Sequence, residues 1–143
     1  MKTKLFEVFV MGSPKPQPRA RSAKGLIGVF NPSTADGWKT MIVAQLKPFI
    51  PGRPIKQAVS LDLDFFFRRP KSHYGTGKNS DLLKASAPVY FTNHYDTDNL
   101  AKVVMDVMPQ IGILYDDAFV VDGRTTKSWG EPSGVNIRLE LMP

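Results

Sequence analysis

The stretch that organises this chain lies at residues 96–106, which read DTDNLAKVVMD. A helix turns by about 100° per residue, so side chains three and four positions apart share a face. From Asp98 to Met108 this spacing predicts a helix. Its packing face would be formed by Leu100, Val103, Val104 and Val107. The opposite face carries Asp98, Lys102 and Asp106, so the pattern predicts one helix with a packing face and a charged face.

The same stretch is acidic within a basic chain. Residues 96–117 hold five aspartates and one lysine, a formal charge of −4; the whole chain carries +6, so the remainder carries +10. Crowded carboxylates repel one another unless protons or cations neutralise them. The chain has no cysteine and no histidine pair at ligand spacing, and an all-oxygen cluster suits Mg²⁺ or Mn²⁺. Lys102, one turn beyond Asp98, could stabilise negative charge on a phosphate.

A metal site is the favoured interpretation of these carboxylates, with alternatives. Asp96 and Asp98 would point the same way in an extended approach to the helix, because side chains alternate there. A third carboxylate would come from the turn at residues 116–117. The competing explanation is that Asp98 caps the helix, and calcium loops or acidic surface patches also fit. Capping leaves Asp96 and residues 116–117 unexplained, so we expect a divalent metal site that works on a polyanion.

The remaining pattern predicts a second helix and several strands. The predicted strands are residues 4–11, 25–30, 57–69, 120–129 and 135–141. Asn31 as N-cap and Pro32 at the first helical position would start the helix, which ends before Pro48. Asp62 and Asp64 fall on the polar face of residues 57–69, where a solvated surface role is favoured over metal binding.

Length and composition favour one domain, residues 1–143. The absence of cysteine excludes disulfides and thiolate metal sites. No apolar run reaches the roughly 18–20 residues of a membrane span, and Glu7 interrupts the N-terminal hydrophobic run, unlike a signal peptide. We therefore expect a cytoplasmic protein. A pI near 9.7 favours an anionic partner, either nucleic acid or an acidic membrane surface, although many proteins simply have a basic surface.

Two basic segments could meet a sugar–phosphate backbone. Residues 13–24 contain three prolines at alternate positions, which exclude a helix and favour a stiff, extended arm; a solvated loop is the alternative. Residues 70–95 have the pattern of a long loop, usually functional or disordered. Within it, a structural or solvent-facing role is favoured for His73 and His94. The candidate DNA contacts are Lys15, Arg19, Arg21, Lys24, Arg68, Arg69 and Lys71.

Parts of the chain also resemble a known family. The residues that carry the resemblance are 96–102, Asp106 and the run LYDDAFVVD at 114–122, with weaker similarity at 12–21 and 69–74. Together they resemble the signature of the RusA family of Holliday junction resolvases, the crossover junction endodeoxyribonucleases of bacteria and phages. One departure is Tyr95, which stands where many members have proline.

The resemblance implies roles for the acidic residues. Asp96, Asp98 and Asp117 correspond to the metal-binding carboxylates, and Lys102 corresponds to the catalytic lysine. Asp116 adjoins the third carboxylate and is a weaker metal candidate. Asp106 would have a supporting or structural role.

The resemblance also implies a fold and an activity. The fold would be α/β (α+β), a small single domain with a mixed β-sheet packed by two main helices. The protein would be a homodimer that nicks a four-way DNA junction at two symmetric points, as a two-fold axis requires, in a Mg²⁺-dependent reaction of DNA recombination and repair. The alternatives are a metal-dependent nuclease for flaps or forks and a non-catalytic DNA-binding accessory protein.

Overall fold

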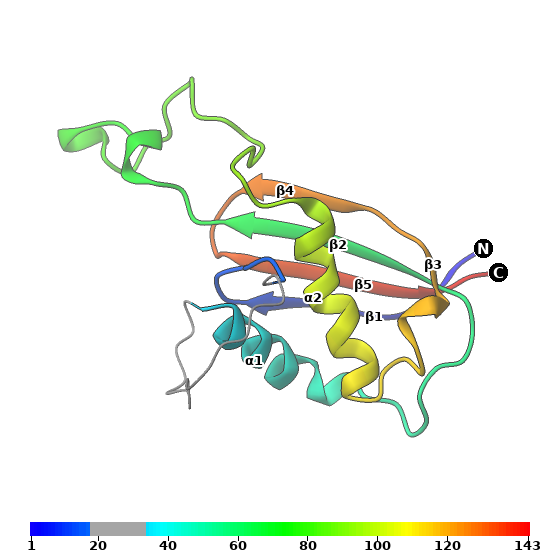
Figure 1. Cartoon of the computed structure of the whole chain (residues 1–143). Coiled ribbons are helices and arrows are strands. Elements are labelled where there is room, and N and C mark those ends of the chain that lie inside the picture. Colours follow the sequence, from blue (N-terminus) through cyan, green and yellow to red (C-terminus); the bar gives the residue numbers. More distant parts are fainter. Residues whose placement is uncertain (18–33) are drawn as a thin grey trace.

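The computed structural model describes residues 1–17 and 34–143. At its centre lies strand β2 (Val59–Phe67). Its alternate residues from Val59 to Phe67 are buried, as the predicted alternation requires. On one side β2 pairs antiparallel with β5 (Gly134–Leu141), which pairs antiparallel with β1 (Thr3–Met11). On its other side β3 (Val120–Asp122) and β4 (Thr125–Trp129) follow one another, both parallel to β2. The result is a mixed, five-stranded sheet (Figure 1).

Two helices cover the same face of this sheet (Figure 1). They are α1 (Ala35–Leu46) and α2 (Thr97–Gln110). Their buried side chains are Trp38, Ile42 and Leu46 from α1, and Leu100, Val103, Val104, Val107 and Met108 from α2. Burying each large apolar side chain contributes about 1.5–3 kcal/mol. The predicted packing face of residues 98–108 and the predicted fold class, a small mixed-sheet domain with two main helices, are therefore confirmed.

The predicted start of the first helix is wrong. The N-cap of α1 is Thr34, whose Oγ1 accepts a hydrogen bond from the backbone N–H of Gly37 at 3.0 Å. Helix α1 therefore begins at Ala35, and the predicted cap Asn31 and first helical residue Pro32 lie outside the described residues. Several residues in a row here favour an N-cap, and only the tertiary position of the helix selects among them. The predicted strand at residues 25–30 lies outside the described residues.

The single strand predicted over residues 120–129 is also wrong, because Gly123 divides it into β3 and β4. Gly123 has φ of +140°, and a Cβ atom there would lie 1.9 Å from the carbonyl oxygen of Leu61. The next residue, Arg124, donates its N–H to Oδ1 of Asp62 at 2.9 Å. The break interrupts the regular pairing with β2 between Asp122 and Thr125, while the chain stays beside β2.

A long connection projects beyond the end of the sheet, at the upper left of Figure 1. It contains the short 3₁₀ turns η2 (Lys71–His73) and η3 (Gly77–Asn79), in keeping with the predicted loop over residues 70–95. The chain returns along β4, where the N–H of Phe91 donates to the carbonyl of Lys127 and the N–H of Trp129 donates to that of Val89. We call residues 70–88 the projecting arm. A further 3₁₀ turn, η1 (Lys47–Phe49), follows α1.

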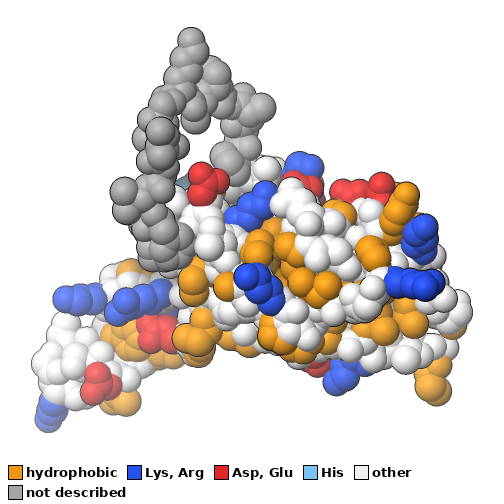
Figure 2. Space-filling view, turned by 90° about the horizontal axis from the view of Figure 1, so that it is seen from below, with side chains coloured by type: hydrophobic (Ala, Val, Ile, Leu, Met, Phe, Trp, Pro, Cys, Tyr) orange, Lys and Arg blue, Asp and Glu red, His pale blue; other side chains and the backbone are white. Residues whose placement is uncertain are grey.

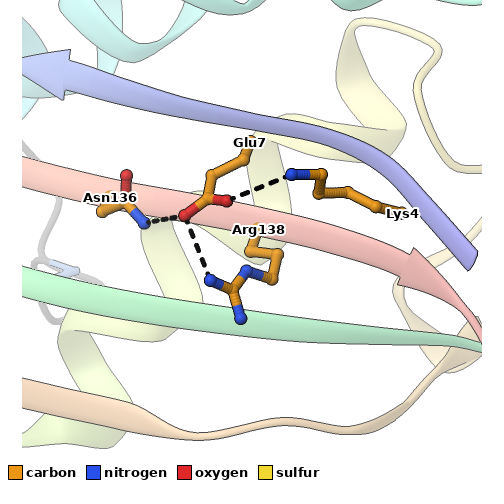
Figure 3. A network of polar contacts seen from close by, with 4 residues as sticks. All are labelled: Lys4, Glu7, Asn136 and Arg138. Atoms are coloured by element: carbon orange, nitrogen blue, oxygen red, sulfur yellow. Dashed lines mark hydrogen bonds and ion pairs between the residues drawn. The ribbon is translucent and has the colours of Figure 1, made fainter. Parts of the chain in front are cut away.

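The other face of the sheet carries a polar network (Figure 3). Glu7 of β1 accepts hydrogen bonds from Asn136 at 2.9 Å and Arg138 at 3.3 Å, both on β5, and lies 3.7 Å from the Lys4 ammonium. The hydrogen bonds from Asn136 and then Arg138 hold the pKa of Glu7 below its ordinary value of 4.5.

Within residues 1–17 and 34–143, no helix is long and apolar enough to cross a membrane.

Candidate active site

The amino end of α2 presents two exposed aspartates. Asp96 is the N-cap residue with extended backbone angles (φ −74°, ψ 144°), yet its side chain makes no capping hydrogen bond. Asp98 lies inside the first helical turn, so the prediction that it caps the helix is wrong. The expectation that Asp96 and Asp98 point the same way along an extended segment is wrong for the same reason, because Asp98 is helical. Both carboxylates lie near the positive end of the helix dipole, which stabilises negative charge.

The charged face of α2 continues with Lys102 and Asp106 at successive turns. The ammonium nitrogen of Lys102 lies 3.7 Å from Oδ1 of Asp106. Opposite them, the turn η4 (Asp117–Phe119) packs against α2. Asp117 is close enough for Asp106 to raise and Lys102 to lower its pKa. The fold thus brings Lys102, Asp106 and Asp117 together from segments that are apart in the chain.

The two adjacent aspartates of the turn have different environments. Asp116 caps η4, and its Oδ1 accepts the N–H of Ala118 at 2.8 Å. That bond, followed by a hydrogen bond with Asp117, lowers the pKa of Asp116. The pKa of Asp117 is raised, first by its hydrogen bond with Asp116, then by burial and by repulsion from Asp116 and Asp106. Crowding of this kind makes it costly for both carboxylates to be ionised at the same time.

The chemistry of this site fits a hard divalent cation. All its acidic ligands are carboxylates, which Mg²⁺ and Mn²⁺ prefer, and a cation would offset the repulsion around Asp117. In the part of the chain that the structure describes, however, no three histidine, aspartate or glutamate side chains already form a group that could hold a metal ion. The ligand set Asp96, Asp98 and Asp117, with Asp116 as a further candidate, therefore stays a prediction.

The predicted DNA contacts fall in different places. Lys15 lies beside the amino end of α2, with its ammonium 5.9 Å from the centre of the Tyr95 ring. Arg68 is exposed and faces Glu131 at 3.8 Å, and Lys71 is exposed on the projecting arm. Figure 2 shows basic side chains at the left end of the molecule and others on its right. Arg19, Arg21 and Lys24 lie outside the described residues.

Arg69 has a structural contact of its own. Its guanidinium donates to the carbonyl of Pro88 at 2.9 Å and lies 3.3 Å from Nδ1 of His73. Arg69 therefore ties the two ends of the projecting arm together. His73 also packs edge-on against Trp129, which agrees with the structural role favoured for this histidine.

Asp62 and Asp64 hold strands together and do not belong to the acidic cluster. Asp62 accepts the N–H of Arg124, and Asp64 accepts the hydroxyl of Thr126 at 2.7 Å. Both are half-buried, so the expected solvated surface role is replaced by a strand-linking one. Their alternation along β2 could not reveal these partners, which lie about sixty residues away in the chain.

Two features beside the site were not predicted. Lys127 of β4 donates to the carbonyl of Tyr95 at 2.7 Å and so fixes the residue before Asp96. Beneath it, Phe67 and Phe91 stack with their centres 3.8 Å apart, and Tyr95 lies 5.9 Å from each. The density of aromatic residues near positions 65–67 and 90–95 was a signal in the sequence, although their contact required the fold.

Comparison with known proteins agrees with this picture. The family model that matches the chain describes an endodeoxyribonuclease and covers residues 11–140. The chain therefore belongs to the RusA family of endodeoxyribonucleases, and it is an enzyme that acts on DNA. A search among curated proteins found no match.

Proposed function

We propose that residues 1–143 form a single RusA-like domain that resolves Holliday junctions as a Mg²⁺-dependent endodeoxyribonuclease. Membership of the family supports cleavage of DNA. The observation that carries the site assignment is the position of η4, which sets Asp117 against the charged face of α2. Capping of α2 does not explain Asp96 and Asp98, because Asp96 makes no capping hydrogen bond and Asp98 lies inside the first helical turn.

In the proposed reaction Asp96, Asp98 and Asp117 hold the metal, with Asp116 as a further candidate. A bound divalent cation polarises a phosphoryl oxygen and makes water a better nucleophile. Lys102 holds the scissile phosphate and offsets the negative charge that grows during attack. Asp106 positions the Lys102 ammonium from one turn away. Mn²⁺ would support the same chemistry, because it accepts the same oxygen ligands.

Phosphate contacts outside the site would come from both basic segments. The N–H of Gln17 donates to the carbonyl of Asn99 at 3.0 Å, so the segment that carries Lys15 is tied to the start of α2. Arg68, Lys71 and the predicted contacts Arg19, Arg21 and Lys24 would extend this surface, with Arg69 supporting it. Binding through phosphates weakens steeply as salt rises.

Two symmetric nicks require two active sites, so we propose a homodimer with a two-fold axis. The reaction would serve DNA recombination and repair, and the cytoplasm is the compartment that we propose for it. Flaps and forks are the alternative branched substrates.

The test compares a synthetic four-way junction, a three-way junction and linear duplex at one salt concentration in Mg²⁺. We expect paired nicking of the four-way junction. Asp98→Asn should lower its nicking rate by about 100-fold or more while binding persists. Asp81→Asn, an exposed change on the projecting arm, is the matched control. Retained nicking by Asp98→Asn would overturn the site assignment, and equal cleavage of all three substrates would overturn the junction preference.

A further inference from the structure

A cavity of about 250 Å³ opens beside the amino end of α2. It lies where β1 and β2 end and β5 begins, because its walls include residues 13–15, Arg68 and Ser133. A third wall is formed by residues 93–95, which immediately precede Asp96. Pockets for drug-sized ligands measure about 300–1,000 Å³. This cavity is smaller and suits a single heterocycle.

The lining of the cavity is aromatic. Phe67 and Phe91 are among the lining residues; they stack on one another and are almost fully buried, at 7% and 6% exposure. Tyr95 is half-buried above them, and the exposed ring of His94 meets the Tyr95 ring edge-on, with centres 4.6 Å apart. Flat ring surfaces that remain accessible to solvent can stack on the π-face of any nucleobase.

Polar groups at the mouth complement a nucleotide. The exposed Asn93 carries an amide donor and an amide acceptor, which can pair with the edge of a base. Lys15 and Arg68 bring positive charge to the lining, and the exposed Arg68 also lies 3.8 Å from Glu131. Among residues 1–17 and 34–143, no acidic side chain lines the cavity. Its charge and hydrogen-bonding groups therefore suit one nucleotide of a DNA strand.

The cavity is also held in position relative to the candidate active site. The bond from Lys127 to the carbonyl of Tyr95 fixes the backbone between the cavity and Asp96. The bond from Gln17 to Asn99 fixes the opposite wall against α2. A strand with its phosphate at Asp96 and Asp98 would thus have a neighbouring base at the cavity mouth.

We propose that this cavity takes one unstacked nucleobase of the strand being cut, next to the scissile phosphate. The inference rests on the proposed function and adds a reason for substrate choice. Unstacking a base costs least where its pairing is already disturbed, and a branch point is such a place. In a continuous duplex the bases are stacked and paired, so placing one of them in the cavity costs more free energy than at a branch point. The cavity would therefore favour branched over linear DNA.

The test is a double-mutant cycle between enzyme and substrate. The substrates are a set of four-way junctions, each with one abasic residue. Across the set, this residue occupies in turn each of the three nucleotides on either side of the cut. The enzyme variant is Tyr95→Leu, which removes the accessible ring and keeps an apolar side chain. Asn93→Ala tests the amide, and Tyr90→Leu, an exposed aromatic residue outside the cavity lining, is the matched control. Thermal unfolding shows which variants are folded.

At one abasic position we expect the single-turnover nicking rate of the unaltered enzyme to fall about tenfold, near the lower end of what base stacking contributes. Tyr95→Leu should cause a similar fall on the intact junction. Tyr95→Leu acting on that abasic junction should nick no more slowly than either change alone. Tyr90→Leu should leave the nicking rate unchanged. Additive losses of about 100-fold at every sensitive position, or no sensitive position, would overturn the inference.

The same cycle is measured on equilibrium binding of the junctions without metal, by fluorescence anisotropy. This second measurement separates the two proposals. Absence of nicking by the unaltered enzyme would refute the proposed function, while coupling in binding would still support the cavity. If the effects of the abasic residue and of Tyr95→Leu are independent in both binding and cleavage, the proposed role of the cavity is refuted. The proposed function would then still stand.

Discussion

The ammonium nitrogen of Lys102 lies 3.7 Å from Oδ1 of Asp106, one helical turn further along α2. The Lys102 side chain is 57% exposed, so this pair contributes little to stability, about 0.3–0.5 kcal/mol before screening by salt. The pair places the ammonium on the charged face of α2, where Lys102 is close enough to Asp117 to lower its pKa.

Variants of Lys102 and Asp106 should separate the effect of this pair on stability from its effect on nicking. Lys102→Met should lower the nicking rate by about 100-fold, a typical cost of losing a group that stabilises the transition state. Asp106→Asn should lower it by about tenfold, because the ammonium is less well placed, with almost no change in Tm. The double variant should be no slower than Lys102→Met. Additive losses in the double variant would show that Asp106 acts independently of Lys102.

The crowding of carboxylates around Asp117 predicts a trade of stability for activity. Asp117→Asn removes the repulsion from Asp116 and Asp106 that raises the pKa of Asp117, so we expect a higher Tm for the metal-free variant. Added Mg²⁺ should raise the Tm of the unaltered protein and leave that of the variant unchanged, since a ligand stabilises only the state that binds it. Differential scanning fluorimetry with and without Mg²⁺ tests both, with Asp81→Asn as the control. A lower Tm for metal-free Asp117→Asn would contradict the repulsion.

The Glu7 network predicts a pH-dependent contribution to stability. Because the folded state lowers the pKa of Glu7, its stabilisation is present above the unfolded value of about 4.5 and is lost as pH falls through the lower folded value. Glu7→Gln should therefore be less stable than the unaltered protein at pH 7, and the difference should shrink below about pH 4.5. Urea unfolding at several pH values measures this. A difference that persists unchanged at pH 2–3 would argue against the network.

Gly123 should tolerate no side chain. A Cβ atom there would lie 1.9 Å from the Leu61 carbonyl oxygen at a φ of +140°. Gly123→Ala should cost more than about 2 kcal/mol of the free energy of unfolding, because it combines backbone strain with a clash. Gly52→Ala, where a Cβ would meet nothing within 4 Å, should change stability by no more than about 0.5 kcal/mol. Chemical denaturation of both variants provides the comparison, and equal effects would refute this account.

Much of the fold could be predicted from local pattern. The alternation of residues 57–69 predicted β2, and the helical spacing of residues 98–108 predicted α2 with its buried and charged faces. Each depends only on neighbours in the chain, because periodicity is a property of one element. The start of α1 and the break at Gly123 could not be predicted, since each depends on which contact partner the folded chain supplies.

The sequence by itself determined the chemistry of this protein: a carboxylate-rich motif, a lysine one turn beyond Asp98, and a basic remainder suited to DNA. Only the tertiary structure decided which of these groups meet. Packing of η4 on α2 sets Asp117 beside Lys102 and Asp106, and the ends of β1, β2 and β5 converge on the aromatic cavity before Asp96. The physical reason is that residue types and spacing are local, whereas proximity between distant segments follows from strand pairing and burial.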